Sequence, residues 1–216
     1  LIGYDGLRET LTYDALVISS GTRNGFWRTS HFENFEDVQR NLTEKSKAIL
    51  SADRLAIIGG GPTAVSVASN IKEMRSDAEV NLFFSQKTPL PSYHPRTRRK
   101  IEKLLKSQGV VLHPMHRANV PTDLDVEDFS SDPISWTSGQ EPFDADLTLW
   151  AIGKLTPNNE FIPADMLTSE GFVKSDIFLR VAGYDNVFTV GDIAKTDDNR
   201  SSARNAGHLI LAHNVK

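Results

Sequence analysis

Cysteine is absent from the 216-residue sequence. Its absence excludes disulfide frameworks, cysteine-ligated zinc, iron–sulfur clusters, thiol nucleophiles and redox-active dithiols from these residues. A chain without cysteine is compatible with a reducing compartment, which favours the cytoplasm or a similar environment without assigning the compartment.

An excess of basic residues and a long apolar run are missing as well. The 24 Lys and Arg residues are outnumbered by 28 Asp and Glu residues, which gives a formal net charge of −4. This balance argues against general nucleic-acid binding, because that function needs a basic face. No apolar run approaches the roughly 18 residues of a transmembrane helix. With 39% hydrophobic and 24% charged residues, the composition is that of a folded protein that can bury its own core.

Strand-like and helix-like patterns alternate through the centre of the chain. Apolar runs at 54–58, 79–84 and 110–112 indicate strands, and the segments 62–74 and 96–108 between them have helical character. The β-α-β-α-β order predicts an α/β fold with a parallel sheet covered by helices. Further elements are expected at 35–51 (helix), 146–152 and 187–190 (strands) and 201–216 (helix).

A glycine-rich turn joins the first of these central strands to the helix 62–74. It fits the pattern G-x-G-x-x-G/A, with Gly59, Gly61 and Ala64 in the three small positions. Gly59 allows a tight turn, Gly61 leaves room for a pyrophosphate, and Ala64 lets the helix pack close to the strand. The helix start, with Pro62 and Thr63, offers free N–H groups to an anion. The alternative is a glycine-rich turn in an α/β domain that binds no ligand.

The end of the strand 79–84 bears on the choice of nucleotide. An acidic residue there would bind the ribose hydroxyls of NAD, but the strand is followed by Ser85-Gln86-Lys87. Ser85 and Lys87 favour a 2′-phosphate, and hence NADP or mixed use. Arginines follow at 96, 98 and 99, and we interpret them as the solvated start of a helix rather than as ligand contacts. NADH and NADPH both remain open.

Two further strand ends have small or polar residues that suit a ligand. The apolar run 16–18 is followed by Ser20, Gly21 and Thr22, and the strand 187–190 is followed by Gly191-Asp192. Glycine permits a close approach of the backbone, and the carboxylate of Asp192 can accept hydrogen bonds from a polyol or sugar. Taken alone, Gly-Asp after a strand is also a common turn.

The order of these pieces is more specific than any one of them. The glycine-rich turn lies between a strand end at Gly21 and another at Gly153, and the Gly191-Asp192 pair comes last. In this order the chain resembles, over roughly residues 5–215, the flavoproteins of the pyridine nucleotide-disulfide oxidoreductase superfamily. It is most similar to the branch without redox cysteines, which includes apoptosis-inducing-factor-like proteins, ferroptosis-suppressor-like quinone reductases and type II NADH dehydrogenases.

This resemblance implies two cofactors, FAD and NAD(P)H, and a set of binding residues. For NAD(P)H the implied residues are Gly59, Gly61, Pro62, Thr63 and Ala64 at the pyrophosphate, with Ser85 and Lys87 beside the ribose. For FAD they are Ser20, Gly21, Thr22, Gly153, Gly191, Asp192 at the ribityl chain, and His208 near the flavin ring.

The resemblance also predicts a doubly wound, Rossmann-like NAD(P)-binding domain inserted in a partial FAD-binding domain. Residues 1–25 match the tail of the first half of the FAD-binding domain, 26–150 the NAD(P)H-binding domain, and 151–216 the second half of the FAD-binding domain. The family's first G-x-G-x-x-G and its C-terminal domain have no counterpart here. We therefore expect a fragment that is inactive alone and holds FAD weakly, and that forms oligomers, if any, through the missing regions.

The predicted activity is that of an FAD-dependent NAD(P)H oxidoreductase. Hydride passes from the nicotinamide to the flavin, and electrons then pass to a small-molecule acceptor such as a quinone, without a redox disulfide. No catalytic side chain, metal site, nucleic-acid partner or transmembrane segment is predicted, and His113 is interpreted as a surface residue. The alternative is a non-catalytic dinucleotide-sensing module. Ser66 favours that alternative, because many family members have Glu at this position.

Overall fold

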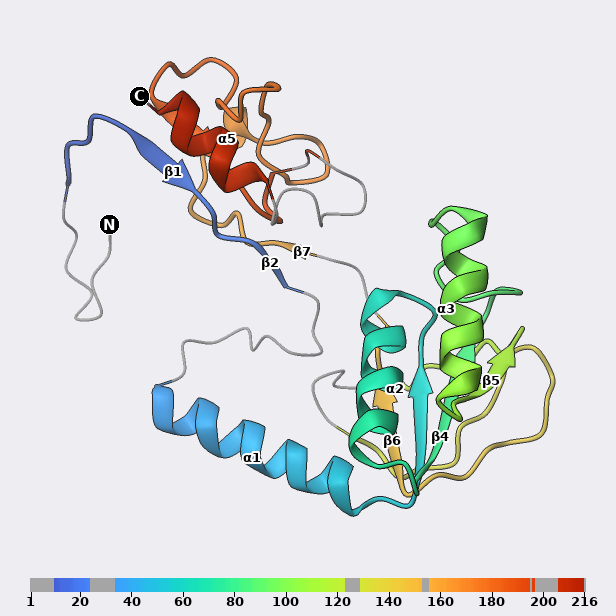
Figure 1. The fold of residues 1–216 in the computed structure, drawn as a ribbon. Coiled ribbons are helices and arrows are strands. Elements are labelled where there is room, and N and C mark those ends of the chain that lie inside the picture. Colours follow the sequence, from blue (N-terminus) through green and yellow to red (C-terminus); the bar gives the residue numbers. More distant parts are fainter. Residues whose placement is uncertain are drawn as a thin grey trace. The chain divides into compact units, whose positions relative to one another are not determined.

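The computed structural model describes residues 10–23, 34–122, 129–152, 156–194, 196 and 206–215. The chain separates into two compact units. One unit consists of Leu1–Arg23 and Leu155–Lys216, and the other of Asn24–Lys154. The strands of each unit pair only within that unit in the described part of the chain (Figure 1).

The unit Asn24–Lys154 is built on a four-stranded parallel sheet. Its strands are β3 (Arg54–Ile58), β4 (Glu79–Phe84), β5 (Val111–Pro114) and β6 (Leu147–Trp150), in the spatial order β5-β4-β3-β6. All three pairings in this sheet are parallel. The predicted α/β class with a parallel sheet is therefore confirmed.

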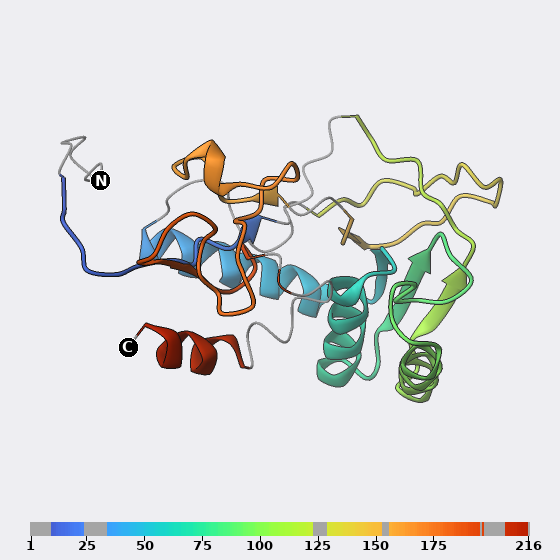
Figure 2. The same cartoon turned by 90° about the horizontal axis from the view of Figure 1, so that it is seen from above.

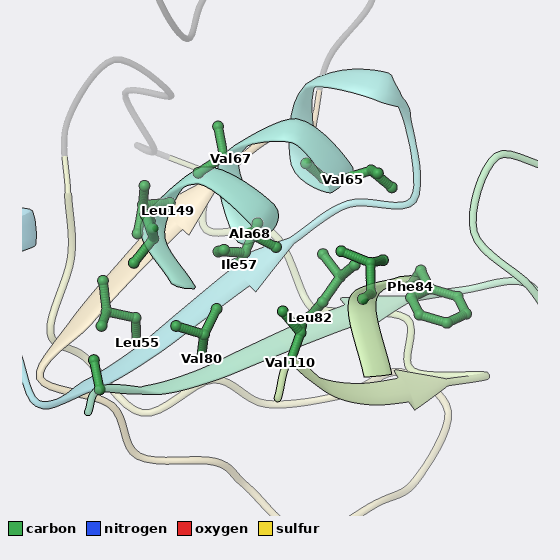
Figure 3. Packing of buried hydrophobic residues seen from close by; sticks show 14 of the residues in the cluster. Leu55, Ile57, Val65, Val67, Ala68, Val80, Leu82, Phe84, Val110 and Leu149 are labelled. Atoms are coloured by element: carbon green, nitrogen blue, oxygen red, sulfur yellow. The ribbon is translucent and has the colours of Figure 1, made fainter. Parts of the chain in front are cut away.

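One face of this sheet is covered by α2 (Pro62–Met74) and α3 (Pro95–Ser107). In Figure 3 the labelled side chains of β3 and β4 point toward the helix that carries Ala68. These strands are buried on both faces, so they appear in the sequence as continuous apolar runs. The main core members are Leu55, Ile57, Val65, Val67, Ala68, Ile71, Val80, Leu82, Leu105 and Leu149.

The opposite face is covered by the irregular segment between β5 and β6 (Figure 2). Phe83 lies at the centre of the side-chain cluster on this face. Its ring stacks on Trp136, with ring centroids 4.6 Å apart, and on His113, with centroids 4.1 Å apart. The Nε2 atom of His113 lies 2.9 Å from Oδ1 of buried Asn81. The prediction that His113 lies on the surface is wrong. Side chains alternate between the two faces along β5, and His113 points to the face that carries Phe83 and Asn81.

Helix α1 (Phe35–Ser51) precedes the sheet, at the predicted position. Its N-cap is Asn34, whose side chain accepts a hydrogen bond from the N–H of Asp37. At its other end, the Arg75 guanidinium donates to the carbonyl of Leu50 and to the carboxylates of Asp53 and Asp77. Arg75 therefore joins the ends of α1 and α2 to the start of β3.

The unit formed by Leu1–Arg23 and Leu155–Lys216 contains two short strand pairs. β1 (Leu16–Ile18) pairs in parallel with β8 (Val187–Thr189), and β2 (Thr22–Arg23) pairs antiparallel with β7 (Thr156–Pro157). A 3₁₀ turn, η1 (Ala164–Met166), follows β7. Helix α5 (Gly207–Asn214) ends the described chain, within the predicted 201–216, of which 201–205 lie outside the described residues. The core of this unit is Ile18, Ile162, Met166, Val173, Val181, Val187 and Ile193.

Candidate functional site

Gly59 forms the tight part of the turn between β3 and α2. Its φ is 147°, and a Cβ built there would lie 2.4 Å from the carbonyl oxygen of Ala151 and 3.3 Å from the Cβ of Ala64. Its N–H donates to the carbonyl oxygen of Phe83 at 2.9 Å, which extends the sheet into the turn. No side chain fits at Gly59, because backbone atoms of Ala151, just after β6, and the buried Ala64 of α2 enclose it.

Gly61 has a different environment from Gly59. No heavy atom lies within 4 Å of the position that its Cβ would take, so the turn opens to free space there. Gly61 is the N-cap of α2 with no side-chain cap, Pro62 begins the helix, and the first turn carries no acidic residue. The N–H groups of Thr63 and Ala64 have no intrahelical acceptor, and the helix dipole favours negative charge at this end. These residues fit a pyrophosphate.

The segment after β4 lies against this turn. The N–H of Leu90 donates to the carbonyl oxygen of Gly60 at 2.7 Å, and a Cβ at Gly60 would lie 3.0 Å from the Cβ of Phe84. Ser85 and Lys87 are both exposed in this segment. Ser85 and Lys87, the predicted ribose contacts, therefore lie only a few residues before Leu90, whose N–H bonds to the glycine turn.

In the other unit, the predicted FAD residues Ser20–Thr22 and Gly191-Asp192 lie at one end of a strand pair. The parallel register pairs Ile18 with Thr189, so Ser20–Thr22 and Val190–Asp192 both follow carboxyl ends at the same edge. Gly21 and Gly191 have φ values of 71° and 84°, which glycine adopts without strain. Asp192 is half-buried, and its Oδ1 is shielded from solvent. Ligands of parallel α/β sheets bind at such carboxyl ends.

Asn158 is a site residue to which the sequence argument assigned no role. Its side-chain amide donates to the carbonyl of Ser20 at 2.9 Å, and its own N–H donates to the carbonyl of Gly21 at 3.0 Å. In return, Ser20 Oγ donates to the carbonyl of Asn158 at 2.7 Å. Three hydrogen bonds thus hold the Ser20-Gly21 strand end against the segment after β7.

A cavity of about 520 Å³ lies beside Gly191 in the same unit. Its wall includes Ala206, Gly207 and Ile210 from the start of α5, whereas the side chain of His208 is exposed to solvent. The predicted contact at Gly153 lies outside the described residues. The remaining wall residues are Ser175, Asp176, Ile177, Leu179, Val190, Gly191 and Thr196.

Two other kinds of site were tested in the part of the chain that the structure describes. No three His, Asp or Glu side chains there are arranged to hold a metal ion. None of the helices in those residues has the length and apolar character needed to span a bilayer.

Comparison with known proteins decides the family. The family model for pyridine nucleotide-disulphide oxidoreductases matches residues 4–209. The chain belongs to this family. Its members bind FAD and NAD(P)H, the two cofactors that the resemblance implies.

Two curated relatives match most of the chain. Oxidoreductase ptaL of Pestalotiopsis fici is 26% identical over 220 residues, which cover 98% of this chain and 58% of that protein. Ferroptosis suppressor protein 1 of Taeniopygia guttata is 25% identical over 191 residues, which cover 86% of this chain and 51% of that protein. The chain thus spans between half and three-fifths of the length of these relatives.

The fold agrees with solved structures of low sequence identity. LpdA from Mycobacterium tuberculosis superimposes with a TM-score of 0.67 at 19% identity, covering 97% of this chain and 44% of that one. The water-forming NADH oxidase from Lactobacillus brevis, bound to NADH, gives a TM-score of 0.63 at 17% identity, covering 98% and 48%. At these identities the likeness establishes the fold.

Proposed function

We propose that this chain is the greater part of the cofactor-binding region of an FAD-dependent NAD(P)H oxidoreductase that works without a redox disulfide. The observation that carries the proposal is the contrast between two glycines in one turn. Gly59 is enclosed by the sheet and α2, and Gly61 opens to free space at an uncapped helix start. A turn that served packing alone would not need free space at Gly61.

In this proposal the unit Asn24–Lys154 binds NAD(P)H. The N–H groups of Thr63 and Ala64 donate to the pyrophosphate, and the bare backbone at Gly61 allows its close approach. Ser85 and Lys87 face the ribose side of the nucleotide. These residues hold and orient the nucleotide, and none of them needs to donate or accept a proton.

The other unit contributes the FAD contacts in this proposal. The carboxylate of Asp192 accepts hydrogen bonds from the ribityl hydroxyls, Gly191 leaves space for them, and Ser20, Gly21 and Thr22 line the neighbouring strand end. When bound, FAD supplies the acceptor for the nicotinamide hydride and the donor of electrons to a substrate such as a quinone. The lack of cysteine among the 216 residues fits an acceptor other than a protein disulfide.

A second function, dinucleotide sensing without turnover, is favoured by one observation. Ser66 is exposed on α2 and has no acid or base chemistry, at a position where many family members have Glu. This reading keeps the nucleotide contacts and removes the redox step.

An absorbance spectrum of the full-length protein tests both functions. We expect the visible band of oxidised flavin in the purified protein and its loss on anaerobic addition of NADPH or NADH. Nucleotide binding without a flavin band, or a flavin band that neither nucleotide bleaches, would reject the oxidoreductase proposal and leave the sensing module. The Gly61→Val variant is the matched control, because its side chain fills the open space at the helix start and should abolish bleaching without removing the flavin band.

A further inference from the structure

The outer face of α3 carries a row of positive charge. The exposed cations of this helix recur at helical spacing and are Arg96, Arg99, Lys100, Lys103 and Lys106. At about 100° per residue, their side chains fall within an arc of about 120°. This arc lies opposite Leu105, which is buried in the core under the helix. We call these five residues the basic stripe.

The basic stripe is unfavourable for the helix that carries it. Like charges three or four residues apart repel each other, as those of Arg96 and Lys100 do. The first turn of α3 contains no acidic residue to complement the helix dipole. In the part of the chain that the structure describes, only Lys106 of the stripe has an ion-pair partner, which is Glu102 at 2.7 Å. A surface that breaks local rules in this way is expected where a partner of opposite charge binds.

Negative charge collects on the opposite face of the same sheet. Residues 118–146, between β5 and β6, contain eight Asp and Glu residues and no Lys or Arg. An antiparallel bridge joins Ile134 to Phe143, and so brings the acidic residues on either side of this pair close together. Three acidic residues here are exposed and take part in no ion pair of the described residues: Asp132, Glu141 and Asp144. We call these three residues the acidic surface.

The sheet keeps the basic stripe and the acidic surface apart within one copy of the chain. Helix α3 packs on one face through Leu105, and the segment between β5 and β6 packs on the other through Ile134 and Trp136 (Figure 2). Because packed layers are about 10 Å apart, the two charged surfaces are separated by more than the screening length of about 8 Å. Neither surface can neutralise the other in a single copy.

We propose that the basic stripe binds the acidic surface of a second copy of this chain, in a twofold dimer with two such contacts. A nucleic acid or an anionic membrane is a poorer partner, because outside this face it meets a chain of net negative charge. The stripe also has no aromatic side chain that could stack on bases. This dimer contact is independent of the proposed nucleotide site, and it lies within the 216 residues rather than in the missing regions of the resemblance.

Analytical ultracentrifugation of the chain tests this contact by charge reversal. Lys103→Glu reverses the centre of the basic stripe, and Asp144→Lys reverses a charge of the acidic surface. We expect a weak wild-type dimer that dissociates when the salt is raised from about 50 mM to about 500 mM. Either variant should raise the dissociation constant at least about tenfold. Lys47→Glu, at an exposed position on α1, is the matched control and should dimerise like the wild type.

The decisive sample is a mixture of the two variants. A mixed dimer joins the two reversed charges at one contact and the two native charges at the other, so both contacts are complementary again. We expect the mixture, and the double variant, to dimerise within about threefold of the wild type. Unfolding cannot produce this recovery. Lys103→Glu also relieves repulsion from Arg99 and Lys106 within α3, so the variant should fold.

Several outcomes would overturn the proposed dimer. These are a wild type that stays monomeric at low salt, a dimer weakened by only one of the two variants, and a mixture that does not recover. Vesicles that contain phosphatidylserine test the other partner. Wild-type binding to them that Lys103→Glu abolishes and Asp144→Lys leaves intact, without a dimer, would assign the basic stripe to a lipid surface instead.

Discussion

The carbonyl oxygen of Ala151 lies 2.4 Å from the position that a Cβ would take on Gly59. Ala151 follows β6 and Gly59 follows β3, so the close approach joins the ends of two adjacent parallel strands. Two residues later in the turn, Gly61 has open space where its Cβ would lie. The two glycines therefore serve different purposes, one in packing and one in ligand access.

Alanine substitutions at these glycines should separate stability from binding. Gly59→Ala meets a backbone atom at a φ of 147°, and should destabilise the unit Asn24–Lys154 by roughly 2–4 kcal/mol. Gly61→Ala meets no atom, and should cost about 1 kcal/mol or less while weakening nucleotide binding at least about tenfold. Denaturant unfolding and calorimetry measure the two effects. Equal stability loss in both variants would contradict this assignment.

Asn158 should stabilise the unit formed by Leu1–Arg23 and Leu155–Lys216. Asn158→Ala removes the donor to the Ser20 carbonyl at 2.9 Å and should cost about 1–2 kcal/mol. Because the two strands belong to different compact units, amide hydrogen exchange should speed up in Leu16–Ile18 and stay unchanged in Arg54–Ile58. Asn70→Ala, at an exposed position on α2, is the matched control. Faster exchange in both strands would argue against a local effect.

His113 should make the sheet sensitive to mild acid. Burial, and after it the charge of His116, lowers the pKa of His113 below its ordinary 6.5. The unfolded chain therefore binds the His113 proton at a higher pH than the folded chain does. The stability that neutral His113 contributes is complete above pH 6.5 and is lost as the pH falls below it. His113→Gln should flatten the pH dependence of the thermal midpoint below 6.5, and the exposed His213→Gln should not. Parallel curves for wild type and His113→Gln would contradict the prediction.

Asp77 should contribute to stability down to strongly acidic pH. Hydrogen bonding from the Arg75 guanidinium lowers the pKa of Asp77 from 3.8 to about 2. The contribution is complete above pH 3.8 and is lost as the pH falls toward 2, because only then is the folded carboxylate protonated. The thermal midpoint of Asp77→Asn should lie below that of wild type at neutral pH and approach it toward pH 2, with exposed Asp144→Asn as the control. High salt should reduce the difference.

Local patterns were sufficient to predict the glycine turn. The apolar run of β3, the small residues at 59, 61 and 64, and Pro62 at the helix start are neighbours in the chain. Their backbone angles and the free N–H groups of a helix start follow from short-range geometry. For the same reason apolar periodicity predicts α1, and Pro62 in the first helical turn predicts the start of α2.

Contacts between residues far apart in the chain determine the features that the sequence did not predict. Ser20 and Asn158 are 138 residues apart, and no local pattern indicates that they bond. The sequence predicts a surface position for His113, because its contacts with Phe83 and Asn81 come from another strand. The sequence predicts a solvated Arg98, but its side chain is half-buried and reaches Thr88 in the preceding segment. The sequence determined the turn and the family order by local geometry, and only the tertiary structure decided which side chains are removed from water, since burial is a property of the packed chain.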